Sequence, residues 1–270
     1  MTILTFIKIH PFLFFMKFKT TPYHHDLLKD HDRLSVFYQA IEEYDGDFEL
    51  AYDLGCGSGV LSYFLTSRFK EIIALEINRK SFECAKENLK DFDNVSVVNC
   101  DASGYDFEKK ADLIVCEMLD TALIDEEEIP VLNHAKKFLK EDGKIIPQGV
   151  INTVELINMQ RRHVHWDEES DYETLSDEVP YSKLDFLEDI NPEFKADLSL
   201  NAKKEGIVNG LKITTYTKLN DNLIAGPLPM LNPPLLIPMD ERHVNINDFI
   251  SVEIKYIMGN GIESIETRYL

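Results

Sequence analysis

The segment Asp53-Leu-Gly-Cys-Gly-Ser-Gly59 restricts the fold of this chain more than any other feature. It follows a short apolar run over 48–54 and precedes a predicted helix over 60–69. Glycines at such a turn let the backbone approach a bound ligand closely. In a dinucleotide fingerprint the third small residue would fall on Val60, so the spacing favours a nucleoside ligand that has no pyrophosphate. A tight turn without a ligand is the alternative interpretation.

Strand and helix patterns alternate through the first half of the chain. This alternation predicts a parallel sheet with helices on both faces, which is the doubly wound α/β class. Glu76 ends the second predicted strand, 21 residues after Gly55, where an acid can accept hydrogen bonds from both hydroxyls of a ribose. The predicted strands are 48–54, 71–76, 95–100, 112–116 and one starting at 144, and the predicted helices are 23–46, 60–69, 82–89 and 129–139.

The pattern changes after Pro147. Apolar and polar residues alternate over 150–159, 210–216 and 250–257, with turn residues between them, which is typical of antiparallel strands. We therefore predict a Rossmann-like sheet domain over 16–148, followed by a smaller, mainly antiparallel, β-barrel-like domain over 149–270. Residues 1–15 are interpreted as an extension ahead of the first domain, with Met16 as the expected initiator.

Four segments resemble successive motifs of the class I S-adenosylmethionine-dependent methyltransferases, namely DLGCGSGVLS, ALEIN, NCDA and ADLIVCEM. The resemblance covers roughly residues 24–148 and implies S-adenosylmethionine as the cofactor. It implies that Asp53 and the glycines lie by the methionyl end, that Glu76 holds the ribose, and that Asp101 with the Ala102 amide reads adenine. Asp101 also suits a turn at a strand end. The glycines in question are Gly55, Gly57 and Gly59.

Two further segments resemble the protein arginine methyltransferase group. The run from His25 to Arg33 resembles that group's N-terminal helix, which implies that Arg33 pairs with the carboxylate of the cofactor; a solvated helix arginine is the alternative. Glu117 and Glu126, nine residues apart, resemble the group's double-glutamate loop. The segment 163–166 resembles the part that leads into the group's β barrel.

The chemistry explains why two carboxylates would be needed. A guanidinium spreads its lone pairs by resonance and is a poor nucleophile, so two carboxylates can localise its charge and aim one nitrogen at the sulfonium methyl. Glu117 and Glu126 are therefore the candidate catalytic residues. Glu127 and Glu128 adjoin Glu126, so a solvated charge run is the alternative interpretation for Glu126.

The match to the arginine group is incomplete. The glycine that the group places shortly after its first glutamate is Asp120 here, and its Thr-His-Trp loop has no counterpart near 229–237. Asn232-Pro-Pro-Leu235 is similar to a signature of methyltransferases that act on base amines, but Leu235 stands where that signature has an aromatic residue. We interpret this segment as a turn of the β domain.

The charge of the chain bears on its partners. A net charge of −20 opposes nucleic acid at long range, because sequence-independent binding to it uses Lys and Arg to neutralise phosphates. Residues 117–128 and 167–189 hold most of the excess acid, which favours a protein or peptide substrate that is cationic. An RNA methyltransferase, with a basic groove near Arg161 and Arg162, and a non-catalytic cofactor-binding protein are the alternatives.

Assembly and location complete the expectations. The acidic insertion 167–189 occupies the position of the arm through which the arginine group dimerises, so a homodimer is expected, with a mobile acidic loop as the alternative. The four cysteines lie outside any zinc-ligand spacing and suit a reducing cytoplasm. No apolar run approaches the ~18–20 residues of a membrane helix. We predict a cytoplasmic enzyme without a metal site.

Overall fold

The computed structural model describes residues 18–167, 170–227 and 231–270. The predicted extension 1–15 and the expected initiator Met16 lie outside these residues. Contacts between residues divide the chain into two compact units, each described below by itself. Of the described residues, the first unit holds those up to Cys116 together with Phe138–Ile146, and the second holds those within Glu117–Lys137 and Pro147–Leu270.

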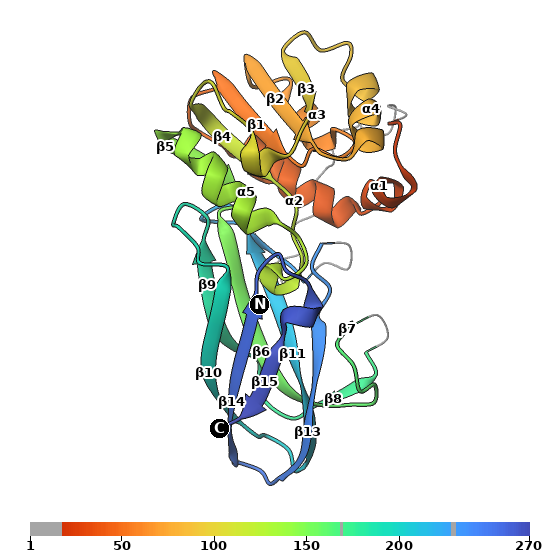
Figure 1. Cartoon of the computed structure of the whole chain (residues 1–270), viewed down its shortest axis with the longest axis vertical. Coiled ribbons are helices and arrows are strands. Elements are labelled where there is room, and N and C mark those ends of the chain that lie inside the picture. The colour runs from red at the N-terminus through yellow and green to blue at the C-terminus, as the bar shows by residue number, and fades with distance from the viewer. Residues whose placement is uncertain (1–17, 168–169, 228–230) are drawn as a thin grey trace. The chain divides into compact units, whose positions relative to one another are not determined.

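The first unit is built on a five-stranded parallel sheet with the order β3-β2-β1-β4-β5, seen edge to edge in Figure 1. The central strands β1 and β4 are buried at every position, which explains why their sequences are apolar except for Asp53 and Asp112. The predicted doubly wound α/β class is confirmed. The strands are β1 (Leu50–Leu54), β2 (Glu71–Glu76), β3 (Val95–Asn99), β4 (Ala111–Cys116) and β5 (Leu139–Ile146), and the helices are α1 (Pro22–Leu27), α2 (His31–Glu42), α3 (Val60–Leu65) and α4 (Arg79–Asn88), with a short 3-10 turn, η2 (Ala102–Gly104).

Several boundaries in this unit differ from the sequence prediction, and two of the differences have a clear physical cause. The helix expected over 23–46 is two helices, because the Asp30 side chain accepts a hydrogen bond from the Arg33 backbone N–H at 2.9 Å and so starts α2 afresh. The last strand begins at Leu139 instead of Lys144, since Leu139 already pairs with Ala111 of β4. Helical pattern and strand pairing compete over this stretch, and the pairing prevails.

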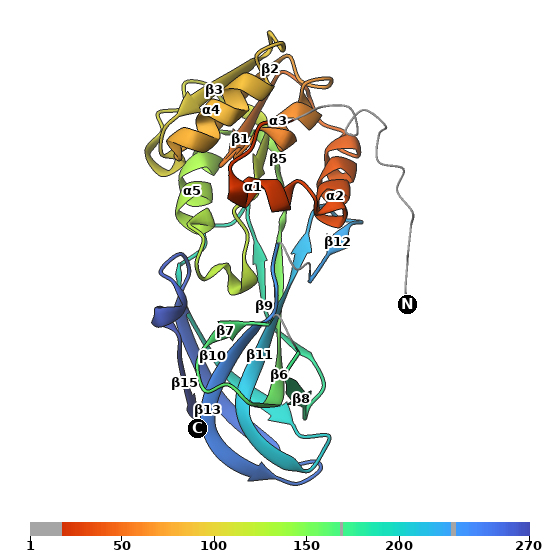
Figure 2. The same cartoon turned by 90° about the vertical axis from the view of Figure 1, so that its right-hand side faces the viewer.

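The described residues of the second unit form two antiparallel sheets and one α-helix, and the mainly antiparallel character agrees with the prediction. Its larger sheet has seven strands, in which β6 and β11 pair over nine residues and run side by side in both Figure 1 and Figure 2. Its smaller sheet has the order β10-β14-β15. The elements are α5 (Glu128–Ala135), β6 (Gly149–Met159), β7 (His165–Trp166), β8 (Tyr172–Thr174), β9 (Val179–Asp185), β10 (Glu193–Asn201), β11 (Gly206–Lys218), β12 (Ile224–Ala225), β13 (Leu235–Val244), β14 (Phe249–Ile257) and β15 (Glu266–Tyr269), with short 3-10 turns η3 (Thr121–Leu123), η4 (Lys136–Phe138) and η5 (Ile262–Ser264).

The acidic segment expected as an insertion takes part in the larger sheet. Its strands β8 and β9 both pair with β6 in antiparallel register. These two strands account for 3 and 7 residues of the segment, so part of it is regular sheet, which differs from the mobile loop that the charge run alone would allow. Within the described part of the chain, no helix combines the length and apolar character that crossing a bilayer requires.

Candidate active site

The turn between β1 and α3 is formed by glycines in a left-handed conformation. The backbone angle φ is 72° at Gly55, 55° at Gly57 and 86° at Gly59, a region that other residues enter only at a cost. The backbone N–H groups of Gly55 and Cys56 both donate to the Leu75 carbonyl at 2.9 Å, which ties the turn to β2. The sequence motif therefore forms the close backbone turn that was predicted.

Glu76 joins the end of β2 to this turn. Its Oε2 accepts a hydrogen bond from the Gly57 N–H at 2.8 Å, and its Oε1 accepts one from the Asn78 N–H at 2.6 Å. The side chain is buried, and burial raises the pKa of this carboxyl. Each carboxylate oxygen has a second lone pair, so the group can still accept hydrogen bonds from ribose hydroxyls.

Asp53, the acid before the glycines, is directed into the protein. It is 1% exposed, and its Oδ2 accepts a hydrogen bond from the Ser62 hydroxyl at 2.5 Å. Ser62 lies in the first turns of α3, so this bond fixes the helix that follows the glycine turn. The predicted contact of Asp53 with the methionyl end stays a prediction.

Asp101 behaves in the structure as a turn residue. It is exposed, and its Oδ1 accepts hydrogen bonds from the Ser103 backbone N–H at 2.8 Å and from the Ser103 hydroxyl at 2.7 Å. It thereby caps the short 3-10 turn η2, in which Ala102 is buried. The turn interpretation therefore describes how Asp101 is held, and its predicted contact with adenine stays a prediction.

Arg33 is not the solvated helix arginine that was the alternative. It is 2% exposed, and its guanidinium donates to the Leu27 carbonyl at 3.0 Å. A guanidinium presents several N–H donors in a rigid fork that matches the geometry of a carboxylate. Such a group on α2 suits the predicted pairing with a carboxylate, which stays a prediction.

His24 on α1 was missed in the sequence, although it adjoins the motif that begins at His25. A Cβ atom added to Gly57 would lie 2.6 Å from His24 Nε2, so the imidazole packs directly on the glycine turn. Its Nδ1 lies 2.8 Å from the Thr21 hydroxyl, and burial followed by the charge of Arg33 lowers its pKa. The imidazole that lines this turn therefore favours its neutral form.

Residues 117–128 form what we call the acidic loop, in the second unit. Glu117 follows Cys116, the residue of β4 that pairs with Leu54 of β1, and it is half-buried. Glu126 is also half-buried, whereas Glu127 is exposed. Burial first, and then the negative charges of Asp125 and Glu127, raise the pKa of Glu126. Glu126 thus differs from its acidic neighbour, which counts against reading it as one of a solvated run.

Asp120, which replaces a glycine of the arginine group, is the most perturbed acid of this loop. It is 9% exposed, and its Oδ2 accepts a hydrogen bond from the Asp125 backbone N–H at 3.0 Å. Burial is the largest of the effects that raise its pKa to about 7, and the negative charges of Glu126 and Asp125 act in the same direction. The side chain therefore closes the loop on itself and carries a proton below neutral pH.

The middle of the acidic loop is strained and anchored. Ala122 and Leu123 have φ of 61° and 57°, which is left-handed backbone without glycine. The Ala122 N–H donates to the Thr215 hydroxyl at 2.8 Å. The carbonyls of Leu123 and Ile124 accept from the N–H groups that follow β14, at 3.0 and 2.8 Å. Tertiary hydrogen bonds therefore hold this turn in place.

The Asn-Pro-Pro segment serves the same loop. Asn232 is fully buried, and its Nδ2 donates to the Thr215 carbonyl at 2.6 Å. The Pro233 carbonyl accepts from the Thr121 hydroxyl at 2.5 Å. The amide and carbonyl that a base-amine methyltransferase would direct at its substrate are engaged within the domain, so the structure supports our interpretation as a turn of the β domain.

Arg161 and Arg162, near which an RNA methyltransferase would have a basic groove, form ion pairs with acidic side chains. Arg161 Nε lies 3.3 Å from Asp171, and Arg162 forms an ion pair with Glu241. Part of the positive charge is thus neutralised locally. Among the described residues, no group of three or more His, Cys, Asp and Glu is arranged to hold a metal ion.

Comparison with known proteins agrees with the fold. The methyltransferase domain family matches residues 51–143. An uncharacterized protein of Methanothermobacter thermautotrophicus is 43% identical over 257 residues, which cover 94% of this chain and 100% of the relative. An uncharacterized protein of Methanocaldococcus jannaschii is 38% identical over 261 residues, which cover 94% of this chain and 98% of the relative.

The matches to more distant relatives cover about half of this chain and less than half of the length of each relative. A ribosomal protein L11 methyltransferase of Thermoanaerobacter sp. is 32% identical over 127 residues, which cover 46% of this chain and 39% of the relative. A probable protein arginine N-methyltransferase 6.1 of Oryza sativa subsp. indica is 29% identical over 145 residues, which cover 51% and 38%.

Among solved structures, the Trypanosoma brucei PRMT1 enzyme-prozyme heterotetrameric complex with AdoHcy matches with a TM-score of 0.77. The match covers 92% of this chain and 96% of that chain at 15% identity, so it concerns the fold. The predicted family, cofactor and fold are thereby confirmed. This chain belongs to the class I S-adenosylmethionine-dependent methyltransferases, in one family with the two archaeal proteins, and it resembles the protein arginine methyltransferases.

Proposed function

We propose that this enzyme transfers the methyl group of S-adenosylmethionine to a protein side chain, namely to a guanidinium nitrogen of arginine held by Glu117 and Glu126. The observation that carries the proposal is the environment of Glu126. This carboxyl is half-buried with a raised pKa, within an anchored loop that starts directly after β4. A desolvated carboxylate is stabilised when a cation binds to it, so the loop favours a positively charged substrate.

The two glutamates would act by orientation. Two charge-assisted hydrogen-bond pairs fix a guanidinium in one plane and concentrate its positive charge on the gripped nitrogens. The remaining nitrogen keeps more of its lone pair and can be aimed in line at the sulfonium methyl. The cofactor supplies the electrophilic methyl, and the chain supplies position and charge.

The cofactor would be held by the first unit. In this proposal Glu76 accepts the ribose hydroxyls, Arg33 pairs with the methionyl carboxylate, and Asp101 with the Ala102 amide reads adenine. Asp53 and the left-handed turn with Gly55, Gly57 and Gly59 shape the methionyl end. His24, which packs on Gly57, would exclude water beside that turn.

Ionisation gives the proposal a pH dependence. Glu126 must be deprotonated to bind a guanidinium, and its pKa lies above the ordinary glutamate value. The rate of methyl transfer should therefore fall as the pH is lowered, starting at a higher pH than for an ordinary glutamate.

The test uses an arginine-rich peptide, radiolabelled S-adenosylmethionine and amino-acid analysis of the product. Glu117→Gln is expected to lower kcat/KM by about 100-fold or more, because one of the two half-buried carboxylates that would grip the guanidinium is lost. Its binding of S-adenosylhomocysteine should stay within about twofold of wild type. Glu127→Gln is the matched control, since Glu127 is an exposed acid of the same loop. Turnover that survives Glu117→Gln would contradict the double-glutamate mechanism.

A second arm of the test identifies the substrate class. Label that nuclease releases and protease does not would assign the activity to RNA instead of protein. Equal turnover on acidic and arginine-rich peptides at low salt would refute the cationic substrate.

We also propose a cytoplasmic location, which the four free cysteines fit. We further propose a homodimer. Sedimentation as a monomer at micromolar concentration would contradict it.

A further inference from the structure

Thr215 has an unusual position for a side chain in the middle of a sheet strand. It lies on β11, is 1% exposed, and its hydroxyl makes two hydrogen bonds. The oxygen donates its proton to Asn152 Oδ1 at 2.6 Å and accepts the Ala122 N–H at 2.8 Å. A hydroxyl has one proton, so the bond to Asn152 leaves a lone pair directed at the acidic loop.

The Ala122 amide needs this acceptor. Ala122 and Leu123 are successive left-handed residues without glycine, which is an intrinsically unfavourable backbone. Both residues are fully buried, so an N–H that lost its partner would have no water to replace it. The strained turn and the Thr215 hydroxyl therefore depend on each other.

The neighbouring bonds fasten the same turn to the β domain. The Thr121 hydroxyl donates to the Pro233 carbonyl, and Asn232 Nδ2 donates to the carbonyl of Thr215 itself. Thr121 and Ala122, which start the turn, are thus bonded to residues 232–233 and to β11, respectively. The bond from Asn232 to Thr215 joins these two segments to each other. All of these groups lie in the second unit.

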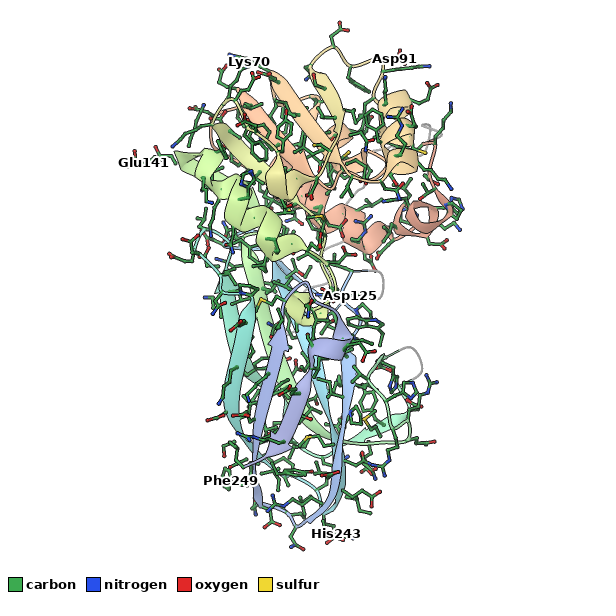
Figure 3. The ribbon with its side chains drawn as sticks, viewed as in Figure 1. Lys70, Asp91, Asp125, Glu141, His243 and Phe249 are labelled. Carbon is green, nitrogen blue, oxygen red and sulfur yellow. The ribbon has the colours of Figure 1, made fainter. Side chains whose placement is uncertain are left out.

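The turn separates the two glutamates of the loop. Glu117 precedes it, and Glu126 follows Asp125, the loop residue labelled in Figure 3. The Asp125 N–H is held at 3.0 Å by Asp120, which closes the loop beyond the turn. A change at Ala122 would therefore alter the backbone path that fixes the spacing between the glutamates.

We propose that Thr215 is a positioning residue of the enzyme, whose hydroxyl holds the acidic loop in its left-handed turn and thereby sets the spacing of Glu117 and Glu126. The proposal rests on the proposed function for its effect on turnover, but not for its effect on the loop. Thr215 touches neither substrate nor cofactor in this role and acts through Ala122.

The test compares three variants of the full-length protein. Thr215→Val keeps the shape and removes the hydroxyl, Thr215→Ser keeps the hydroxyl, and Thr214→Val is the matched control on the opposite face of β11. Amide hydrogen exchange over 120–126, S-adenosylhomocysteine binding and kcat with an arginine-rich peptide are measured for each.

Thr215→Val is expected to speed amide exchange in the loop by at least about tenfold and to lower kcat by a similar factor. Cofactor binding should stay within about twofold, and both Thr215→Ser and Thr214→Val should resemble wild type. Adding Ala122→Gly to Thr215→Val should restore part of the lost kcat and part of the slow amide exchange in the loop, because glycine adopts the left-handed turn without strain.

Unchanged loop exchange in Thr215→Val would overturn the proposal, and so would a Thr215→Ser variant that behaves like valine. The serine variant keeps the test decisive if the valine variant does not fold. Should wild type fail to methylate arginine, the proposed function is wrong, while the exchange measurement still decides the role of Thr215.

Discussion

Two of the left-handed turns in the molecule, one in each unit, are of opposite design. In the turn after β1 all three left-handed residues are glycines, Gly55, Gly57 and Gly59, so the conformation is intrinsically cheap. In the acidic loop the left-handed residues are Ala122 and Leu123, so the conformation exists only because tertiary hydrogen bonds hold it. The first turn is therefore encoded locally, and the second by its surroundings.

The largest expected effect that sharpens this comparison concerns Asp120 in the acidic loop. Its pKa of about 7 in the folded protein lies above the ordinary value of 3.8. The folded state therefore keeps a proton that the unfolded chain releases near pH 4, so this residue makes the protein less stable as the pH rises between these values. The resulting decrease in the free energy of unfolding reaches about 4 kcal/mol at pH 8.

Asp120→Asn should remove that dependence. The free energy of unfolding of the variant, relative to wild type, is expected to increase by about 4 kcal/mol between pH 4 and pH 8. Denaturant titrations at a series of pH values measure it. Asp125→Asn, a change at an exposed acid of the same loop, serves as the control. Parallel pH profiles for Asp120→Asn and wild type would show that Asp120 is already ionised at low pH.

The next effect concerns the glycine turn. Gly57→Ala places a Cβ 2.6 Å from His24 Nε2 on a backbone with φ of 55°. The strain and the displaced imidazole should weaken S-adenosylhomocysteine binding by about 30-fold, equivalent to about 2 kcal/mol. Titration calorimetry measures the affinity. Gly104→Ala is the control, because no atom lies within 4 Å of its added Cβ. Equal affinities for the two variants would mean that the turn does not need glycine.

The smallest effect is the reverse substitution in the acidic loop. Ala122→Gly relieves a left-handed residue but loses a buried methyl group and gains chain entropy in the unfolded state. These changes should nearly cancel, so the free energy of unfolding is expected to change by less than about 0.5 kcal/mol. Ala135→Gly, at a buried right-handed position in α5, should instead cost about 1 to 2 kcal/mol. A similar loss in both variants would show that the turn at Ala122 carries no strain.

The same contrast explains which features could be predicted. The parallel sheet followed from apolar runs with regular spacing, and Glu76 was placed at the glycine turn by its position at the end of β2. Boundaries were less accurate where local signals competed with pairing, as at Leu139. His24 was missed because its packing on Gly57 joins residues that are distant in the chain.

The sequence by itself determined the fold class and the identity of the acids, since glycine spacing and strand periodicity are local properties of the chain, and its resemblance to the methyltransferases implied the cofactor. Only the tertiary structure decided how those acids differ from one another. Burial separates Asp120 and Glu126 from Glu127, and Thr215, distant in the sequence, bonds to the turn that lies between the glutamates. Desolvation and long-range hydrogen bonds arise only after folding, so no local pattern of residues announces them.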